Sequence, residues 1–354
     1  MNIVMVSGHA CIRVQKTALP LIEKGHDVHL IANKRPSYYE HYNSFSFAAG
    51  VGQYIEAFKQ HEKSADLFHV HNEPSWYVSA IKETVDKPVV LDVHDSYAAR
   101  VSPEEERRLR EEGKDVSRVF VEERNNFQLA DGLVFPGEAF GNLVKNEFNL
   151  KQPSLVMPSY CPKRWYAYSG EEWLGGLVYE GRVDMAEDLE KKDYLYGFRY
   201  CDYQELAQKA NDIGIGFHIY TARTDDQFVE AYGEISYLHD ARPIQTLING
   251  IGRHDWGLVG NIFATPEWDV AYPNKMFEYI AANVPVCVIN AKECGKLIRK
   301  HGLGIEVESL EELKERWDEH TDIRRNMMKK RQMFCMDNHI HEMLGLYEEV
   351  MLNG

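Results

Sequence analysis

At residues 273–286 the chain reads PNKMFEYIAANVPV. Pro273 and Asn274 are typical of a helix start, and the apolar residues that end the segment predict a short buried strand. A helix N-terminus presents free backbone N–H groups and a partial positive charge, so it suits a phosphate group. Glu278 lies in the first turns of this helix, where its carboxylate can accept hydrogen bonds from a vicinal diol such as a ribose. Phosphate and ribose together indicate a nucleotide, with Asn274, Lys275 and Glu278 as its candidate ligands.

Short apolar runs alternate with longer helical stretches through the first half of the chain. Their dense apolar character is typical of a parallel sheet that is covered on both faces. Because strands and helices alternate, the first half is predicted to be a doubly wound α/β domain. The expected strands are Ile3–Val6, Val28–Ile31, Leu67–Val70, Val89–Val93 and Gly132–Phe135.

A proline-rich region with several aromatic residues, Pro153–Trp173, interrupts this alternation and is interpreted as an interdomain linker. The alternation then restarts, which predicts a second α/β domain. Its expected strands are Gly176–Tyr179, Gly216–Tyr220, Ile235–Leu238, Trp256–Val259, Val286–Ile289 and Gly304–Val307. Its expected helices are Gln204–Asp212, Ile244–Ile248, Asn274–Ala282, Lys292–Lys300 and Leu310–Glu319.

Two further segments are predicted to be helical. The tail from about Phe334 to Met351 has an apolar face at helical spacing, which includes Tyr347 and Val350. The segment Pro103–Asn125 is dense in charge, with opposite charges three and four residues apart, as on a solvated helix face. An acceptor-side or membrane-facing helix is the alternative for that segment, because it follows the fourth expected strand.

The composition limits the class of protein. Its 354 residues include 55 acidic and 40 basic side chains, which gives a formal charge of −15. A protein that binds a nucleic-acid backbone normally carries a basic surplus, so that class is disfavoured. The six cysteines form no Cys-x-x-Cys pair, which favours a reducing compartment without disulfides and without a metal finger.

The chain begins directly with a predicted strand, and no apolar run has the roughly 18–20 residues of a membrane span. We therefore expect a cytoplasmic protein without a signal peptide. Peripheral contact with a membrane surface stays open.

The block at residues 273–286 resembles the helix that holds the donor nucleotide in retaining, GT-B-fold glycosyltransferases of family 4, the group 1 type. The resemblance is strong over Asp255–Val307, fair at Gly176–Arg182 and diffuse in the first half. It implies an α/β protein with two Rossmann-like doubly wound domains that face a central cleft. The expected acceptor-side domain is residues 1–160, with the C-terminal helix 334–354 packed back onto it, and the expected donor-binding domain is residues 165–333.

The resemblance also implies an activity. A hexose-type sugar would pass from a nucleotide-diphosphate sugar, with retention, to an unknown glycan, lipid-linked or other acceptor. Such enzymes usually neutralise the leaving diphosphate with cationic side chains and a helix dipole, so neither a metal nor another cofactor is expected. The absence of an Asp-x-Asp pair from the sequence is compatible with that expectation.

Gly181 and Arg182 follow the expected strand Gly176–Tyr179, at the strand end where doubly wound sheets bind ligands. In the family this arginine contacts the donor diphosphate, which suits a planar and permanently charged guanidinium. A surface ion pair is the alternative role for Arg182. The lysine that usually follows in the family is missing, and Lys191 and Lys192 are distant candidates to replace it.

One departure from the family concerns the donor sugar. Many members carry two glutamates with seven residues between them, and the first contacts the sugar. If Glu278 is the second, the first falls at Val270, and Asp269 is the most plausible substitute. Arg223 lies in a loop that covers the nucleotide base in the family, so it is a further donor-binding candidate.

In the first domain the candidates lie at strand ends. His94 follows Val89–Val93, where family enzymes often hold a histidine that reaches the donor sugar, and Asp95 could orient it. A purely structural histidine is the alternative. Gly8 is the single glycine of a first loop that is glycine-rich in the family. The acceptor-side candidates are His9, Arg13, His71 and Glu73.

Two rival functions stay open. One is a nucleotide-sugar epimerase or hydrolase of the same fold. The other is a catalytically silent, carbohydrate-binding relative, which Val270 and the single glycine of the first loop suggest.

Overall fold

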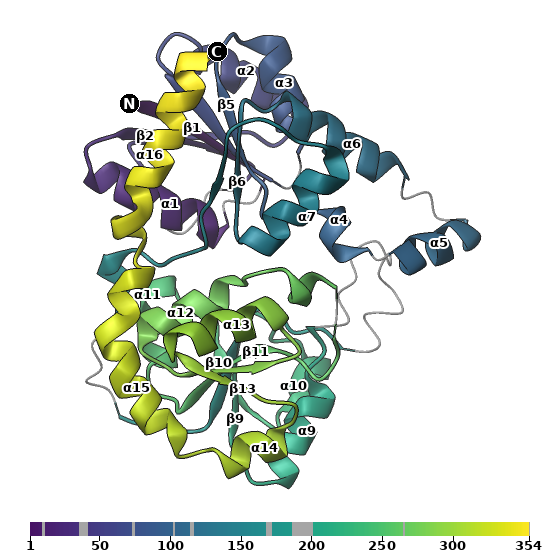
Figure 1. The fold of residues 1–354 in the computed structure, drawn as a ribbon, viewed down its shortest axis with the longest axis vertical. Helices are drawn as coiled ribbons and strands as arrows, with labels where there is room; N and C mark the ends of the chain where they lie inside the picture. The colour runs from purple at the N-terminus through teal and green to yellow at the C-terminus, as the bar shows by residue number, and fades with distance from the viewer. Residues whose placement is uncertain are drawn as a thin grey trace. The chain divides into compact units, whose positions relative to one another are not determined.

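The computed structural model describes residues 1–8, 11–34, 42–72, 75–101, 103–113, 117–167, 172–185, 201–264 and 266–353, and for residues 103–105 and 117 it describes the backbone alone. The chain divides into two compact units (Figure 1). Unit 1 is Met1–Pro162 with Met336–Gly354, and unit 2 is Lys163–Cys335. The candidates His9, Glu73, Lys191 and Lys192 lie outside the described residues.

Within the described residues, unit 1 has one parallel sheet in the order β3-β2-β1-β4-β5-β6-β7. Its strands are β1 (Asn2–Ser7), β2 (Asp27–Ala32), β3 (Ser44–Phe47), β4 (Leu67–His71), β5 (Val89–Asp92), β6 (Gly132–Phe135) and β7 (Ser154–Val156). Its helices are α1 (Ile12–Glu23), α2 (Val51–His61), α3 (Tyr77–Thr84), α4 (Tyr97–Arg100), α5 (Pro103–Glu111), α6 (Ser117–Leu129), α7 (Glu138–Phe148) and α16 (Met336–Asn353).

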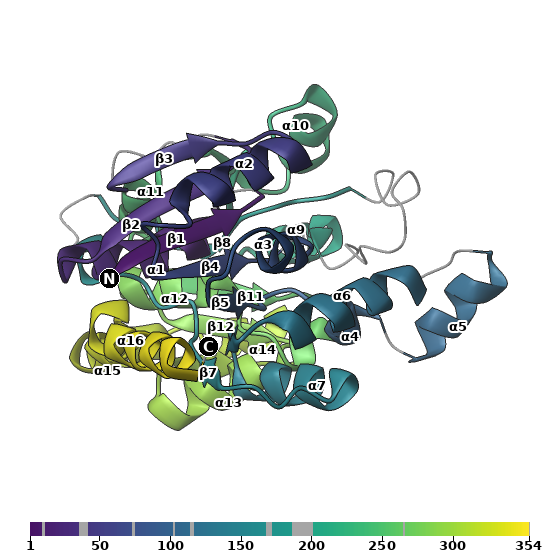
Figure 2. The same ribbon diagram turned by 90° about the horizontal axis from the view of Figure 1, so that it is seen from above.

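Helices cover both faces of this sheet because its strands are apolar on both sides. The helices α1 and α16 lie on one face, and α2 and α3 lie on the other (Figure 2). On the second face Phe58 of α2 meets Phe68 of β4 edge to face, with ring centroids 5.8 Å apart. On the first face Gly132 of β6 makes room for α16, since a Cβ there would lie 2.7 Å from Val350 Cγ2.

Within the described residues, unit 2 has a second parallel sheet in the order β10-β9-β8-β11-β12-β13. Its strands are β8 (Leu177–Glu180), β9 (Phe217–Thr221), β10 (Tyr237–Asp240), β11 (Trp256–Gly260), β12 (Val286–Ile289) and β13 (Gly304–Glu306). Its α-helices are α9 (Gln204–Asp212), α10 (Asp226–Tyr232), α11 (Ile244–Ile251), α12 (Asn274–Ala282), α13 (Lys292–His301), α14 (Leu310–Glu315) and α15 (Glu319–Lys330). Short 3-10 helices are η2 (Lys163–Trp165), η5 (Glu267–Asp269) and η6 (Arg331–Phe334).

A glycine sets the position of α12 on this second sheet. A Cβ at Gly257 in β11 would lie 2.5 Å from the Tyr279 ring, so only glycine lets the helix approach this closely. The Tyr279 hydroxyl then reaches across the sheet and donates to Val178 O at 3.3 Å. The helix that opens at Asn274 is therefore fixed against β8 and β11.

Each sheet has one topological switch point, where the strand order reverses and later strands are added on the other side of the first strand. In unit 1 this point lies between β1 and β4, and in unit 2 it lies between β8 and β11. Doubly wound sheets bind ligands beyond the carboxyl ends of the strands at such points. The topology therefore directs attention to the residues after β1, β4, β8 and β11.

The predicted alternation of strands and helices is confirmed in both halves of the chain. Two edge strands were not predicted, β3 and β7, and β7 lies inside the region that was interpreted as a linker. The helix expected over 310–319 is wrong as one element, because α14 ends at Glu315 and α15 begins at Glu319. Among the helices that the structure describes, none is both long and apolar enough to cross a bilayer.

Candidate functional site

A pocket of about 430 Å³ lies at the carboxyl ends of β8, β9 and β10 in unit 2. It contains three of the predicted donor-binding residues, Gly181, Arg182 and Arg223. Tyr220 and Arg242 also line it. The pocket therefore lies at the carboxyl edge of the sheet, on the β9 side of the point between β8 and β11, and it carries three arginines for an anionic ligand.

Arg182 forms an ion pair with the neighbouring Asp184, and Nε lies 3.0 Å from the carboxylate. The arginine side chain is 45% exposed while the Asp184 side chain is 4% exposed. The ion pair that was the alternative role for Arg182 is thus present. Because the guanidinium is nearly half exposed, it can also present N–H groups to a ligand in the pocket.

Arg223 is held in the loop after β9. Its Nε donates to Asp225 Oδ2 at 2.7 Å, and its backbone N–H donates to Thr221 Oγ1 at 3.2 Å. Asp225 in turn caps α10 by accepting from Phe228 N at 3.0 Å, a typical N-cap contact. The loop therefore has its own hydrogen bonds, which position Arg223 at the pocket.

Lys275 brings a further cation to this edge of the sheet. Its Nζ lies 4.9 Å from the centroid of the Tyr179 ring and 5.9 Å from that of Trp268, as in cation–π contacts. A Cβ at Gly181 would lie 3.7 Å from Lys275 Nζ. Gly181 has φ +126°, a conformation that favours glycine. The end of the Lys275 side chain therefore lies close to Gly181.

The remaining donor candidates do not share one environment. Glu278 follows Lys275 by one helical turn and is 2% exposed, so its carboxylate is withdrawn from solvent. Asn274 is the first residue of α12, and Asp269 is the exposed last residue of η5. Of the described residues that line the pocket, none is one of these three. They lie around the start of α12 instead.

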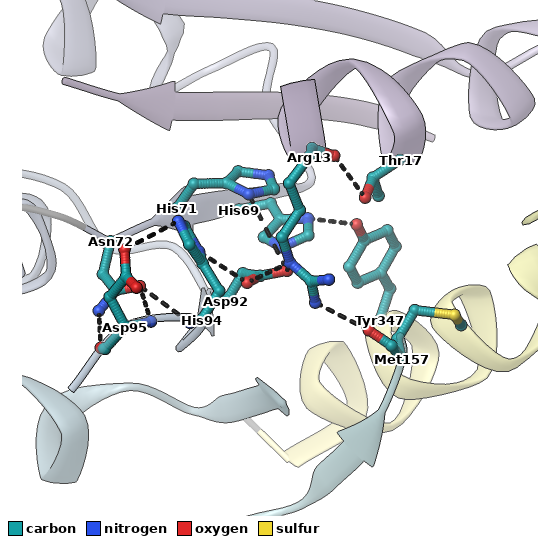
Figure 3. A network of polar contacts seen from close by, with 10 residues as sticks. All are labelled: Arg13, Thr17, His69, His71, Asn72, Asp92, His94, Asp95, Met157 and Tyr347. Carbon is teal, nitrogen blue, oxygen red and sulfur yellow. Dashed lines mark hydrogen bonds and ion pairs between the residues drawn. The ribbon is translucent and has the colours of Figure 1, made fainter. Parts of the chain in front are cut away.

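In unit 1 the strand register brings a second set of side chains together (Figure 3). His71 at the end of β4 is paired with Ser7 of β1 on one side and with Asp92 of β5 on the other. Asp92 is fully buried, and it accepts from Arg13 Nε at 2.8 and 2.9 Å and from His94 Nδ1 at 3.1 Å. A buried carboxylate thus links α1 to the loop after β5.

Arg13 favours the charged form of Asp92. Burial raises the pKa of Asp92, but the Arg13 guanidinium and the hydrogen bond with His94 outweigh it and hold the pKa well below its usual range. Arg13 is 3% exposed and also donates from Nη2 to Met157 O at 2.8 Å. The predicted acceptor-side role of Arg13 is not tested by this arrangement, but its guanidinium is buried in an ion pair.

His94 is the predicted catalytic residue that the structure places most clearly at a strand end. Its side chain is 18% exposed, and its Nε2 lies 3.8 Å from Asp95 Oδ2. Burial lowers the pKa of His94, but the hydrogen bonds with Asp92 and Cys11 and the charge of Asp95 raise it well above its ordinary value. The surroundings of His94 therefore favour its protonated form, and Asp92 rather than Asp95 is the nearer carboxylate.

Asn72 fixes the loop that carries His94. Its side-chain oxygen accepts from the His94 backbone N at 3.0 Å and from the Asp95 backbone N at 3.4 Å, and its amide donates to Asp95 O. Asp95 also forms an ion pair with Arg100. Burial raises the pKa of Asp95, but the charge of Arg100 contributes to lowering it below its ordinary value. The loop is therefore positioned by side chains from two elements.

Cys11 joins this set from the start of α1, where it is the N-cap residue. Burial raises the pKa of its thiol, but the hydrogen bond and charge of His94 and the backbone N–H groups of Val14 and Arg13 outweigh it, so that the pKa is lowered. A cysteine at a helix N-terminus beside a cationic imidazole is an activated thiol. Gly8, the nearby glycine of the first loop, is buried, and its carbonyl accepts from Asn33 N at 3.3 Å.

His71 lies behind His94 in a fully buried layer. It stacks on His69 with centroids 4.4 Å apart, and His69 Nδ1 shares a hydrogen bond of 2.6 Å with the Tyr347 hydroxyl of α16. Burial lowers the pKa of His69 to about 4 and that of His71 well below its ordinary value. His69, His71 and Asp92 lie within metal-binding range of one another, but the Arg13 guanidinium already neutralises the carboxylate.

Sequence reasoning does not single out Asp92, Cys11, Tyr220 or Arg242. Asp92 does carry a signal, because a carboxylate at the last position of an otherwise apolar buried strand needs a cationic partner. Cys11, Tyr220 and Arg242 carry no such signal in the sequence, because their surroundings depend on which elements become neighbours in the fold.

The comparisons with known proteins agree with this fold. Residues 202–335 match the family model described as glucosyltransferase 3-like, C-terminal domain. No curated protein matches the chain by sequence. Among solved structures, sucrose-phosphate synthase from Thermosynechococcus elongatus is similar with a TM-score of 0.75 and 12% identity over 100% of both chains.

Two further solved structures are similar over nearly their whole length. HepE of Anabaena in complex with UDP-glucose has a TM-score of 0.67 and 12% identity, with 98% of this chain and 99% of that chain covered. WaaG, a glycosyltransferase involved in lipopolysaccharide biosynthesis, has a TM-score of 0.59 and 13% identity, with 99% and 98% covered. The chain has the GT-B fold, as the resemblance predicted, and identities this low carry the fold alone.

Proposed function

We propose that the protein is a glycosyltransferase that moves a hexose-type sugar from a nucleotide-diphosphate donor to an acceptor, with retention and without a metal. The observation that carries the proposal is that the side chain of Lys275, at the start of α12, lies close to Gly181, which precedes Arg182. It places two cations and a helix N-terminus at the switch point of the second sheet.

This arrangement suits a leaving diphosphate. Negative charge grows on the diphosphate as the bond to the sugar breaks, so groups that are fixed in advance lower the barrier. Arg182 can donate two parallel hydrogen bonds, and Lys275 adds a point charge next to the N–H groups of the helix. Arg223 and Arg242 lie on the same pocket and can reach a further phosphate or the base.

Glu278 is proposed to hold the ribose, and Asp269 the sugar. Glu278 is one turn inside α12, where the phosphates would occupy the turn before it. Its burial means that a ribose must displace present contacts to reach the carboxylate, but the resulting hydrogen bonds would be shielded from water. UDP-glucose, which is bound in the HepE structure, is the first donor to test.

The test of the activity is turnover with a panel of radiolabelled nucleotide-sugars and candidate acceptors. Transfer to an acceptor, or slow hydrolysis of the donor alone, supports the proposal. The anomeric configuration of the product, read by NMR, tests retention. Rapid release of an epimer or of free sugar would support the epimerase or hydrolase instead, and nucleotide binding without any turnover would support a silent relative.

A binding experiment tests the site itself. The Glu278→Ala variant should bind UDP about 10- to 150-fold more weakly by calorimetry, from the 1.5–3 kcal/mol of a hydrogen bond to a charged group. Glu315→Ala, at the exposed end of α14, is the matched control and should bind normally. Equal UDP affinity in both folded variants would refute the ribose role of Glu278.

A further inference from the structure

Three histidines meet on one face of the second sheet, although they are far apart in the sequence. His218 lies in β9, His239 lies in β10, and His254 lies just before β11. Each offers one ring nitrogen, and the three nitrogens lie within 4.8 Å of one another. None of these residues has a place in the proposed transfer of sugar.

The strand register brings the first two together. Because Tyr237 is paired with His218 and His239 is paired with Tyr220, the two histidines are diagonal neighbours on adjacent strands. Their facing nitrogens, His218 Nδ1 and His239 Nε2, are 3.0 Å apart. A tetrahedral zinc site with Zn–N bonds of about 2.0–2.1 Å would place these nitrogens about 3.3 Å apart, so little movement is needed.

A glycine before β8 leaves room for the His218 ring, and the backbone beside it binds the third histidine. A Cβ at Gly176 would lie 2.9 Å from the His218 ring and 2.5 Å from Gly216 O, so a side chain there would close the space. His254 Nδ1 bonds to Gly175 O at 2.6 Å. A carbonyl only accepts, so Nδ1 carries the proton and Nε2 keeps its lone pair. This is the outer hydrogen bond that metal-binding histidines normally make.

Aromatic rings hold the other two imidazoles in place. His218 stacks on Tyr237 with centroids 4.7 Å apart, and His239 stacks on Tyr220 with centroids 4.3 Å apart. The Tyr220 hydroxyl lies 3.3 Å from His254 Nε2. The rings are thus oriented before any ligand arrives, and the fourth position is available to solvent or to the tyrosine oxygen.

We infer that His218, His239 and His254 bind one divalent transition-metal ion of the zinc class. Three neutral imidazoles and no carboxylate form a nitrogen site, which suits zinc, nickel or copper and not magnesium or calcium. The nearby arginines add to this selectivity. Arg242 lies 5.5 Å above the Tyr220 ring, and Arg253 is engaged with Glu172 O at 2.7 Å. Only a metal with high intrinsic affinity for imidazole overcomes these positive charges.

The ion would have a structural role beside the nucleotide pocket. It would join β9, β10 and the segment before β11 through three side chains. Tyr220, which contacts His239 and His254, also lines the pocket together with Arg242. A bound metal would therefore stabilise unit 2 and fix one wall of the pocket, without contact with the leaving diphosphate.

The test is zinc binding to the full chain after removal of metals with a chelator and dialysis. At pH 8, where ordinary imidazoles are neutral, calorimetry should show a zinc site that the His239→Gln variant has lost. The expected loss of affinity exceeds about 100-fold, since even an outer partner of a ligand is worth about 10–100-fold. His239 is the half-buried member of the set, so its variant should keep the circular dichroism of the wild type.

Two controls locate the metal. His341→Gln, on the exposed side of α16, should bind zinc like the wild type. X-ray absorption of the zinc-loaded chain should show nitrogen at about 2.0–2.1 Å and no sulfur at about 2.3 Å, which separates the histidines from the cysteines. Zinc should also raise the melting temperature of the wild type but not that of His239→Gln.

Three results would overturn the inference. They are no zinc binding by the folded wild type, equal zinc affinity in His239→Gln, and sulfur in the metal shell. Loss of zinc in a His71→Gln variant, with zinc retained in His239→Gln, would also overturn it by assigning the ion to the buried group in unit 1. Each outcome is independent of whether the chain transfers sugar.

Discussion

The Asp92→Asn substitution tests the buried network of unit 1 with little change of shape. Asp92 is 0% exposed, and its carboxylate faces the Arg13 guanidinium at 2.8 Å. Asparagine keeps the volume but removes the charge, so the buried Arg13 cation loses its counter-ion. Breaking a buried ion pair in this way costs about 3–5 kcal/mol. We expect a loss of that size in the free energy of unfolding of unit 1.

Hydrogen exchange followed by mass spectrometry is the appropriate assay, because the two units need not unfold together. The free energy of opening should fall for peptides from β1, β4 and β5. The matched control is Glu106→Gln, which breaks an exposed pair with Arg110 whose side chains are 31% and 61% exposed. That pair is worth about 0.3–0.5 kcal/mol.

The dependence on pH gives a second measurement. The folded pKa of Asp92 is depressed, so its stabilisation is present above the unfolded pKa of about 3.9 and is lost as the pH falls below that value. The difference between wild type and Asp92→Asn should therefore shrink below about pH 4. His94 behaves in the opposite way, because its raised pKa contributes stability below about 6.5 that is lost as the pH rises through the folded value.

The same variant should change the titration of His94. Without the Asp92 carboxylate, the pKa of His94, followed by NMR of its imidazole protons, should fall. An exchange difference no larger than that of Glu106→Gln, or an unchanged titration of His94, would show that Asp92 does not hold this network together.

Four further predictions concern the site. Arg182→Ala should slow transfer by roughly 10²–10³-fold, as for loss of one donor to a developing anion, and should change the melting temperature less, because the guanidinium is 45% exposed; an unchanged rate in the folded fraction would make this arginine structural. His94→Ala should leave UDP affinity nearly normal, because the candidate nucleotide-binding residues of α12 and those after β8 lie in unit 2, but it should slow transfer strongly. In the wild type the rate of transfer should fall at alkaline pH, because His94, whose pKa is raised, then loses its proton. Transfer should continue in excess chelator even after the inferred zinc is removed, because that ion does not contact the leaving diphosphate; a full loss restored by magnesium or manganese would contradict the metal-free mechanism. Iodoacetamide should modify Cys11 first, because burial raises the pKa of Cys201 to about 11 and the cysteines other than Cys11 are buried; peptide mapping that finds another cysteine labelled earlier would refute the activated thiol.

Local sequence signals were sufficient where one element decides the outcome. The segment from Asn274 to Ala282 was predicted as a helix, and the structure has that helix. Apolar runs such as Val286–Ile289 were equally clear, since a buried parallel strand has no polar face to obscure it. The edge strands β3 and β7 were missed because they are only four and three residues long and contain no buried residue, so no apolar run marks them.

The site was predictable only in part. Gly181 and Arg182 were predicted as candidates because they follow a strand, and both line the pocket at the end of β8. Asp92 was missed as the orienting carboxylate in favour of Asp95, which follows His94 directly in the sequence. Asp92 lies 3.1 Å from His94 Nδ1, whereas Asp95 lies 3.8 Å from His94 Nε2. The order of residues in the sequence does not show which carboxylate is nearer to the imidazole.

The histidine cluster is a second case in which the sequence does not reveal which side chains become neighbours. His218, His239 and His254 are each single histidines in the sequence, with no spacing typical of a metal site. The strand now called β10 was expected at 235–238, which leaves His239 in the following loop, whereas the structure has it at Tyr237–Asp240. The error concerns only the ends of the strand, so it is small for the fold. For the cluster it matters, because His239 belongs to the strand, where it pairs with Tyr220 of β9 and lies 3.0 Å from His218.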